Sequence, residues 1–172
     1  MPALRFPTVL FDWGDTVMYD DPTATVPMVE WEQVHPVVDV DQVLTYLQSS
    51  GRRCILATSA DVSSESQIRG ALARAGLDHY FSRIYSFTNT GLPKGETFYR
   101  HILQDLALPA QEALMVGDSF QKDVLIPNSL GIYGVWFSPA DAARSRSDLH
   151  TTVRTMQELL SFWRSLDGRE RD

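Results

Sequence analysis

Near its N-terminus the chain reads Thr8-Val-Leu-Phe-Asp-Trp-Gly-Asp-Thr16, in which strand-forming residues are followed at once by polar and turn-forming ones. A short apolar run of this kind is typical of a strand buried on both faces of a parallel sheet. Comparable runs recur along the chain at residues 54–57, 84–87, 113–116 and 132–137. The sequence therefore predicts five strands, of which segment 8–11 is the first.

Amphipathic stretches separate the predicted strands. Their apolar residues are spaced i, i+3, i+4 and i+7, which places them on one face of a helix. The stripes are Val40, Val43, Leu44 and Leu47; Ile68, Ala71, Leu72 and Ala75; Tyr99, Ile102, Leu103 and Leu106; and Met156, Leu159, Leu160 and Trp163. Pro127 interrupts a further helical stretch, so that helix should be short or irregular. This alternation predicts an α/β fold: a single Rossmann-like three-layer domain, with a parallel five-stranded sheet and helices on both faces.

The composition limits the number of domains and the class of function. With 172 residues, 44% of them hydrophobic, we expect one domain at residues 1–166 and a polar, disordered tail at 167–172. The net charge of -7 argues against a dedicated nucleic-acid binder. The single cysteine, Cys54, cannot form an internal disulfide, and no apolar run reaches membrane-spanning length. Because residues 1–7 contain no apolar stretch, we expect no secretory signal. We expect a soluble cytoplasmic protein that binds no membrane.

Polar residues follow the predicted strands at their carboxyl ends, where open α/β sheets bind ligands. They are Asp12, Gly14, Asp15 and Thr16 after the first strand, Thr58 and Ser59 after the second, and Asp118 and Asp123 after the fourth. Lys94 directly precedes the third predicted helix. Taken singly, each is commonly a turn former, a helix cap or a solvated lysine. As a set they predict a site at one edge of the sheet.

The carboxylates in this set point to a metal ion. Asp12 and Asp118 follow different strands of one parallel sheet, so we expect them to meet in one crevice. Carboxylates that are buried together without a partner are costly. A hard divalent cation relieves that cost, and Mg²⁺ prefers one or two carboxylates together with water and phosphate oxygens. The sequence therefore predicts a Mg²⁺ site.

Four motifs, taken in chain order, resemble those of the haloacid dehalogenase-like (HAD) hydrolase superfamily, and the resemblance covers most of the chain. The first, an apolar strand before D-x-D-G-T, is matched by residues 9–16, and the second, a strand ending in Thr or Ser, by residues 55–58. The third, a lysine ahead of a helix, is matched by Lys94. The fourth, G-D-x(4)-D, is matched by residues 117–123. Each motif lies on the element where that family carries it.

The resemblance implies a Mg²⁺-dependent phosphatase. Asp12 would attack phosphorus and form an aspartyl-phosphate, which water would then hydrolyse. The metal would be held by Asp12, the Gly14 carbonyl, Asp118 and Asp123, and the phosphoryl oxygens by Thr58, Ser59 and Lys94. Electrostatic stabilisation of the transferring group is the main catalytic contribution in such reactions.

The first motif departs from the family pattern at Gly14. In phosphatases of this family an Asp at that position protonates the leaving group, whereas here an Asp stands one residue later, at Asp15. The metal site should survive, because the family uses the backbone carbonyl of position 14. The sequence leaves open whether Asp15 replaces the missing acid. If nothing replaces it, aryl and acyl phosphates should be hydrolysed far better than alkyl phosphates, because losing a general acid costs about 10²- to 10⁴-fold in rate.

The sequence also predicts no large cap domain. Too few residues separate Asp15 from the helix at Val40, and residues 58–94 are used by one helix and one strand. The only candidate lid is the segment 17–36, which contains Met28 and Trp31. Capless members of the family tend to accept large substrates or to shield the site with another subunit. We therefore expect a phosphorylated substrate that is large or has an exposed phosphate, and a homo-oligomer remains open.

Two other functions compete with the phosphatase. One is a metal-independent dehalogenase-type hydrolase, in which the second Asp is also missing; retention of Asp118 and Asp123 favours metal use instead. The other is a degenerate, non-catalytic HAD-like module that binds a phosphate or a partner.

Overall fold

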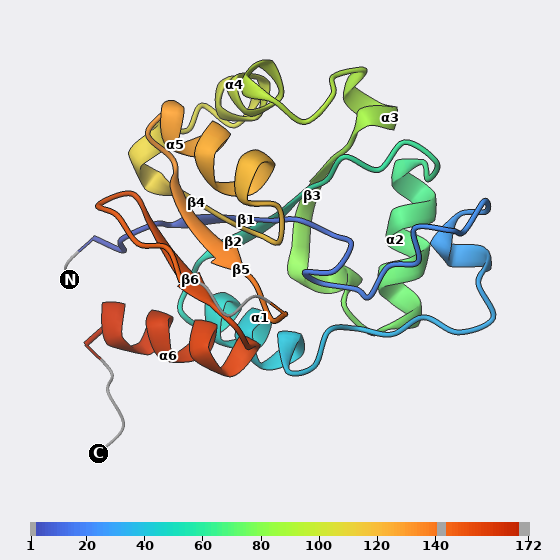
Figure 1. The fold of residues 1–172 in the computed structure, drawn as a ribbon, viewed down its shortest axis with the longest axis horizontal. Coiled ribbons are helices and arrows are strands. Elements are labelled where there is room, and N and C mark those ends of the chain that lie inside the picture. Colours follow the sequence, from blue (N-terminus) through green and yellow to red (C-terminus); the bar gives the residue numbers. More distant parts are fainter. Residues whose placement is uncertain (1–2, 141–143, 169–172) are drawn as a thin grey trace.

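The strands form one sheet in which all neighbours are parallel, in the order β3-β2-β1-β4-β5-β6 (Figure 1). The computed structural model describes residues 3–140 and 144–168, and its strands are β1 (Thr8–Phe11), β2 (Arg53–Ala57), β3 (Phe81–Tyr85), β4 (Ala113–Gly117), β5 (Tyr133–Phe137) and β6 (His150–Val153). The strand order reverses at β1, because β2 and β3 extend the sheet on one side and β4 to β6 on the other. Such a switch point creates a crevice beyond the strand ends.

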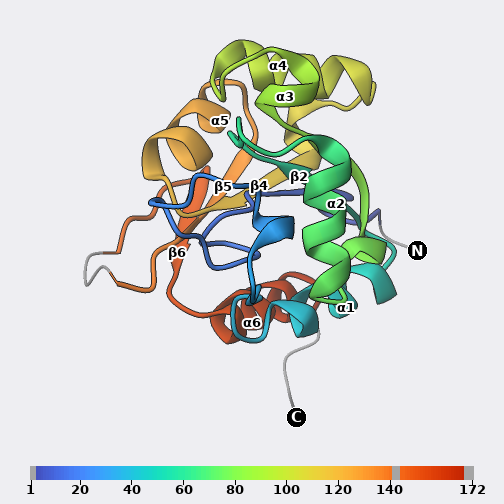
Figure 2. The same cartoon turned by 90° about the vertical axis from the view of Figure 1, so that its right-hand side faces the viewer.

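Helices cover both faces of this sheet, which gives the three layers seen in Figures 1 and 2. They are α1 (Val40–Ser49), α2 (Glu65–Arg74), α3 (Phe87–Thr90), α4 (Glu96–Asp105), α5 (Ile126–Ser129) and α6 (Met156–Leu166). Helices α1, α2 and α6 pack on the face that carries Val9 and Phe11, and α4 and α5 pack on the face that carries Leu10. Successive strand residues point to opposite faces, so β1 contributes to both cores.

The sheet has six strands in the described residues, where the sequence predicted five. The additional strand, β6, pairs with β5 at the sheet edge, with Gly134 opposite His150. It reads His-Thr-Thr-Val and contains no apolar run, although three of its four residues are buried. The number of strands is therefore corrected, while the predicted α/β class, the parallel sheet and the helices on both faces are confirmed.

The third strand also lies earlier than predicted, at Phe81–Tyr85 instead of 84–87. Ser86 ends it, because its hydroxyl accepts a hydrogen bond from the Asn89 backbone N–H while the Asn89 side chain accepts one from the Ser86 N–H. This capping box starts α3 at Phe87. None of the helices in the described ranges is long and apolar enough to cross a membrane.

Two features of the C-terminal half concern predictions from the sequence: the short helix at Pro127 and the tail that begins at Asp167. The helix containing Pro127 is short, as predicted, and follows a π-helical turn at Phe120–Leu125. Asp167, which the sequence assigned to the tail, pairs with the buried guanidinium of Arg52 at 2.6 Å. This ion pair with a buried partner anchors Asp167, and the predicted domain boundary at 166 stays a prediction. Residues 169–172 of the predicted tail lie outside the described residues.

The long connection between β1 and α1, residues 12–39, is held against α2. Its one helical segment is the 3-10 helix Met28–Glu30. The guanidinium of Arg74 on α2 donates to the main-chain carbonyls of Val29 (2.9 Å), Trp31 (2.7 Å) and Glu32 (3.0 Å). The approach is close: a Cβ on Gly70 would stand 2.8 Å from a Val29 methyl. This segment forms one wall of the crevice described below.

Candidate active site

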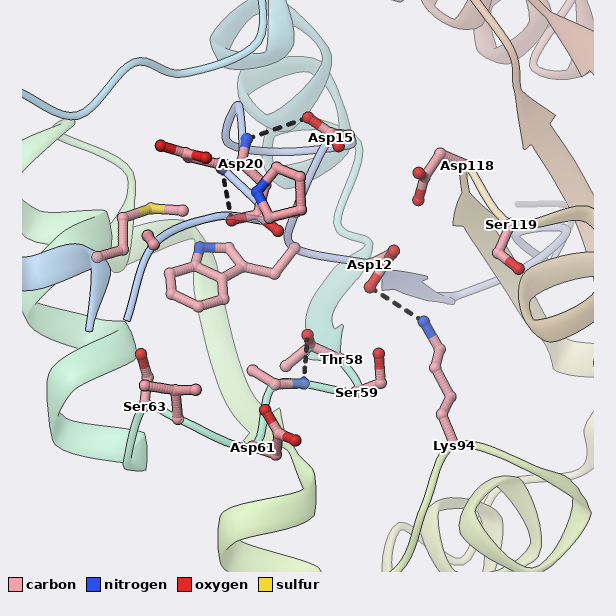
Figure 3. A pocket seen from close by; sticks show the side chains of 18 of the residues that line it. Asp12, Asp15, Asp20, Thr58, Ser59, Asp61, Ser63, Lys94, Asp118 and Ser119 are labelled. Carbon is pink, nitrogen blue, oxygen red and sulfur yellow. Dashed lines mark hydrogen bonds and ion pairs between the residues drawn. The ribbon is translucent and has the colours of Figure 1, made fainter. Parts of the chain in front are cut away.

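Eight of the nine candidate residues from the sequence, all except Thr16, line one cavity of about 430 Å³ at the carboxyl ends of β1, β2 and β4. They are Asp12, Gly14, Asp15, Thr58, Ser59, Lys94, Asp118 and Asp123. Figure 3 shows Asp12, Asp118 and Lys94 facing a common space, with Thr58 and Ser59 beside it. The topology of the sheet, with β1 between β2 and β4, is what brings these distant segments together.

Asp12 extends the pairing of β1 by one residue. Its backbone N–H donates to the Val116 carbonyl on β4 at 2.9 Å, which fixes the backbone at the switch point. Thr16, later in the same loop, turns its hydroxyl toward Asp118 at 3.5 Å. The Asp12 side chain is therefore held next to the residue that follows β4.

Asp12, Asp118 and Asp123 form a carboxylate triad, in which one oxygen from each lies within 4.8 Å of the others. Burial, together with the neighbouring carboxylates of Asp12 and Asp123, raises the pKa of Asp118 to about 7. Burial also raises the pKa of Asp123 to about 6, against the opposing effect of Lys94. Both shifts arise first from burial, and the neighbouring carboxylates add to them. Three convergent carboxylates that lack full compensation fit a hard cation such as Mg²⁺.

Lys94 supplies the positive charge inside this triad. Its side chain is buried, and its ammonium lies 3.0 Å from Asp12 Oδ1 and 2.5 Å from Asp123 Oδ1. Burial alone would lower the pKa of Lys94, but the two carboxylates outweigh that effect and raise it, so the side chain stays charged. A fixed ammonium beside Asp12 can also meet the oxygens of a phosphoryl group.

Asp123 is positioned by the loop after β4. Its Oδ2 accepts a hydrogen bond from the Ser119 backbone N–H at 2.9 Å, and its own N–H donates to the Ser119 carbonyl at 2.7 Å. The side chain is fully buried and lies against Gly117, the last residue of β4. Asp123 therefore reaches the cavity from behind Asp118.

Thr58 and Ser59 follow β2 on the other side of Asp12. The Thr58 backbone N–H donates to the Tyr85 carbonyl at 2.9 Å, which holds it at the strand end. Its hydroxyl oxygen accepts from the Ala60 N–H at 3.2 Å, so the hydroxyl proton can still be donated to a ligand. Ser59 lines the cavity beside it.

Gly14 and Asp15 lie in a tight turn after Asp12. Asp15 has a left-handed backbone with φ of 56°, and its N–H donates to the Met18 carbonyl at 2.6 Å. Its carboxylate accepts the Asp20 backbone N–H at 3.0 Å, on the side of the loop away from Asp12 (Figure 3). The carboxylate thus stabilises the loop, and its replacement of the missing acid stays a prediction.

Asp20 is a cavity residue that the sequence analysis did not identify. A Cβ at Gly14 would stand 3.1 Å from Asp20 Oδ2, so the Asp20 carboxyl group borders the space that a side chain at position 14 would take. Burial, opposed by a hydrogen bond from the Asp21 N–H and reinforced by Asp15 and Asp12, raises the pKa of Asp20. In the sequence Asp20 belongs to a polar run before Pro22, which indicates only a turn.

Comparisons with known proteins identify the family and the fold. The family model of the haloacid dehalogenase-like hydrolases matches residues 22–136, a span that includes Thr58, Lys94, Asp118 and Asp123. A ribulose-1,5-bisphosphate 5-phosphatase from Halopiger xanaduensis is 28% identical over 138 residues, covering 74% of this chain. The chain spans 56% of that relative's length.

Solved structures share the fold. An uncharacterized protein from Listeria monocytogenes serotype 4b superposes with a TM-score of 0.79 at 19% identity, covering 94% of this chain and 98% of that one. A HAD phosphatase from Thermococcus onnurineus gives a TM-score of 0.64 at 26% identity, covering 81% of this chain and 61% of that one. Because the family model matches residues 22–136, which is more than half of the chain, this chain belongs to the haloacid dehalogenase-like hydrolases.

Proposed function

We propose that this hydrolase is a Mg²⁺-dependent phosphatase that forms an aspartyl-phosphate on Asp12. The observation that carries the proposal is the carboxylate triad with one buried ammonium around Asp12, at the switch point of a parallel sheet. The similarity to a phosphatase over 74% of the chain supports the same reaction class.

The residues divide the work by their positions. Asp12 attacks phosphorus, and the Lys94 ammonium, which lies 3.0 Å from Asp12 Oδ1, orients the attacking carboxylate. Lys94, Thr58 and Ser59 then hold the phosphoryl oxygens at the strand ends, where charge spreads in the transition state. Asp118 and Asp123, with Asp12 and the Gly14 carbonyl, would hold Mg²⁺. When bound, the ion offsets the repulsion between the Asp12 carboxylate and the phosphate.

The same triad argues against the two competing functions. Three carboxylates that converge within 4.8 Å favour metal use over a metal-independent dehalogenase. A module that only binds phosphate would gain affinity from more cations and fewer carboxylates. The observed balance suits a site that binds a cation and a phosphate together.

The shape of the site favours a substrate whose phosphate is exposed. The cavity is bounded by the segment 12–39, which carries only the 3-10 helix Met28–Glu30 among its described elements. Met28 and Trp31 on that segment add an apolar wall, which can contact the rest of the substrate. A cytoplasmic location and homo-oligomerisation stay predictions.

The decisive experiment is a panel of phosphate esters assayed with Mg²⁺ and with chelator. Turnover should require both Mg²⁺ and Asp12, so Asp12→Asn should be inactive while Asp41→Asn, an exposed change on α1, behaves as wild type. Turnover of 2-haloacids in chelator would establish the dehalogenase instead. Inactivity of the folded wild type on both substrate classes would favour the binding module.

A further inference from the structure

In the loop after β1, the carboxyl group of Asp20 lies beside Gly14, where a longer residue would place its side chain. Each of the three atoms nearest to a Cβ at position 14 belongs to the side chain of Asp20: Oδ2 at 3.1 Å, Cβ at 3.2 Å and Cγ at 3.3 Å. Asp20 therefore fills the space into which a side chain at position 14 would extend. It also lines the same cavity as Asp12 (Figure 3).

Hydrogen bonds close the turn that brings Asp20 back to the cavity. The Trp13 carbonyl accepts hydrogen bonds from the N–H groups of Val17 (2.9 Å) and Met18 (3.0 Å), which reverses the chain direction. Gly14 and Met18 then form a backbone bridge. Asp15 completes the turn by accepting the Asp20 N–H at 3.0 Å. The position of Asp20 thus depends on a network of hydrogen bonds around a buried turn.

The oxygens of Asp20 have different surroundings. Oδ1 accepts a hydrogen bond from the Asp21 N–H at 2.9 Å, whereas Oδ2 is the atom nearest to the Cβ position of residue 14. Neighbouring acids are engaged elsewhere: Asp15 binds the Asp20 backbone, and Asp21 accepts from the Thr23 N–H at 2.9 Å and hydroxyl at 2.6 Å. Among Asp15, Asp20 and Asp21, Asp20 is the acid whose carboxyl group borders the space for a side chain at position 14.

We propose that Asp20 is the general acid and base of the reaction, in place of a carboxyl group at position 14. The inference rests on the proposed phosphatase function. As the Asp12 oxygen bonds to phosphorus and the phosphorus–leaving-oxygen bond breaks, Asp20 gives its proton to the leaving oxygen and becomes a carboxylate. In the second half, water attacks phosphorus and passes its proton to Asp20, and the bond from phosphorus to Asp12 breaks. Phosphate leaves, and both aspartates return to their starting states.

The leaving group distinguishes this role from a structural one. An alkyl phosphate releases a strongly basic oxygen that needs the proton, whereas p-nitrophenyl phosphate releases a weak base that departs without it. We expect Asp20→Asn to lower kcat for ethyl phosphate by about 10²-fold or more, and kcat for p-nitrophenyl phosphate by less than about tenfold. The matched variant Asp21→Asn, one residue away, should leave the ratio of the two rates unchanged.

A swap variant gives a second test of whether the reaction needs a carboxyl group in this space. Asp20→Gly alone should lose ethyl phosphate turnover. The double change Gly14→Asp with Asp20→Gly removes the three Asp20 atoms nearest to position 14 and places a carboxyl group there. Its kcat for ethyl phosphate should therefore be at least about tenfold higher than that of Asp20→Gly alone.

Several results would overturn the proposal. Equal losses on both substrates, with no recovery in the swap variant, would give Asp20 a structural role only. A selective loss of ethyl phosphate turnover in Asp15→Asn, with Asp20→Asn unaffected, would make Asp15 the acid. Wild-type protein that hydrolyses no ester of the phosphate panel with Mg²⁺ would refute the proposed function itself, whereas the first two results leave that function standing.

Discussion

Gly117 and Asp123 approach each other so closely that a Cβ at position 117 would overlap the Asp123 carboxyl carbon. The last residue of β4 must therefore be glycine if the Asp123 side chain is to lie against it and place its carboxylate beside Asp12 and Asp118. A glycine that precedes Asp118 is thus a steric requirement for the position of a different residue, Asp123. This relation links the packing of the sheet edge directly to the candidate metal site.

The substitution Gly117→Ala should displace Asp123. Because the neighbour is a buried carboxyl group and not the end of a flexible chain, we expect a loss of about 1–3 kcal/mol in unfolding free energy, together with weaker Mg²⁺ binding. Gly95→Ala is the control, since its nearest neighbour beyond the adjacent residues is a carbonyl at 3.8 Å. Chemical denaturation and calorimetry measure both effects. Equal stability of the two variants would contradict the steric argument.

Lys94→Met removes an ammonium that contacts two members of the triad, Asp12 and Asp123. Asp123 is then buried without its partner, and breaking a buried pair costs about 3–5 kcal/mol. The loss should be larger at pH 8 than at pH 5: without Lys94, burial raises the pKa of Asp123 further, so its protonated form favours folding at low pH and that benefit disappears as pH rises. Denaturation of the metal-free protein at both pH values tests this, with Lys122→Met as an exposed control. A loss that does not depend on pH would argue against the pairing.

Much of the site could be predicted from sequence because it depends on two simple regularities. Buried parallel strands have continuous apolar runs, which located β1 and β4, and residues directly after such strands lie at one edge. Asp12, Thr58 and Asp118 each follow a strand without an intervening loop, so their convergence required no knowledge of loop geometry. Lys94 could be placed because it lies at the start of α4.

The missed features depend on tertiary context. Asp20 reaches the cavity through a turn closed by hydrogen bonds to Trp13 and Asp15, and nothing in the local residue pattern records where such a turn points. Strand β6 has polar side chains, and its place at the sheet edge is set by its pairing with β5. The position of Asp167 depends on Arg52, which is distant in sequence and buried only in the folded chain.

Asp167→Ala should destabilise the protein although it lies past the last helix. Arg52 is buried, packs over the Trp163 ring at 4.7 Å and pairs with Asp167 at 2.6 Å, so removal of the carboxylate leaves a buried guanidinium without its ion-pair partner. We expect a loss of about 3 kcal/mol in unfolding free energy. The exposed pair of Arg100 with Glu96 is the comparison, and Glu96→Ala should cost less than about 1 kcal/mol. Similar costs for both would mean that Asp167 is not anchored.

Stabilisation by Mg²⁺ should increase with pH. The pKa of Asp118 is raised to about 7 by burial and by the carboxylates of Asp12 and Asp123. A carboxyl group whose pKa is raised in the folded state favours folding in its protonated form, so its contribution is present below its ordinary pKa and is lost as pH rises toward 7. Ionisation of Asp118 should therefore lower the stability of the metal-free protein between about pH 4 and pH 7. Mg²⁺ should offset this loss, because it binds the ionised carboxylate.

Mg²⁺ binding requires the ionised carboxylate, so its affinity should fall about tenfold between pH 8 and pH 6. Calorimetric titration at the two pH values measures this change, and thermal unfolding with and without Mg²⁺ measures the matching stability. Asp118→Asn provides the control, because it removes the titrating group: it should bind Mg²⁺ much more weakly at both pH values and should lack the loss of metal-free stability that Asp118 causes as pH rises. If the variant binds Mg²⁺ like the wild type, the ion does not use Asp118, and the raised pKa reflects only burial and the neighbouring carboxylates of Asp12 and Asp123.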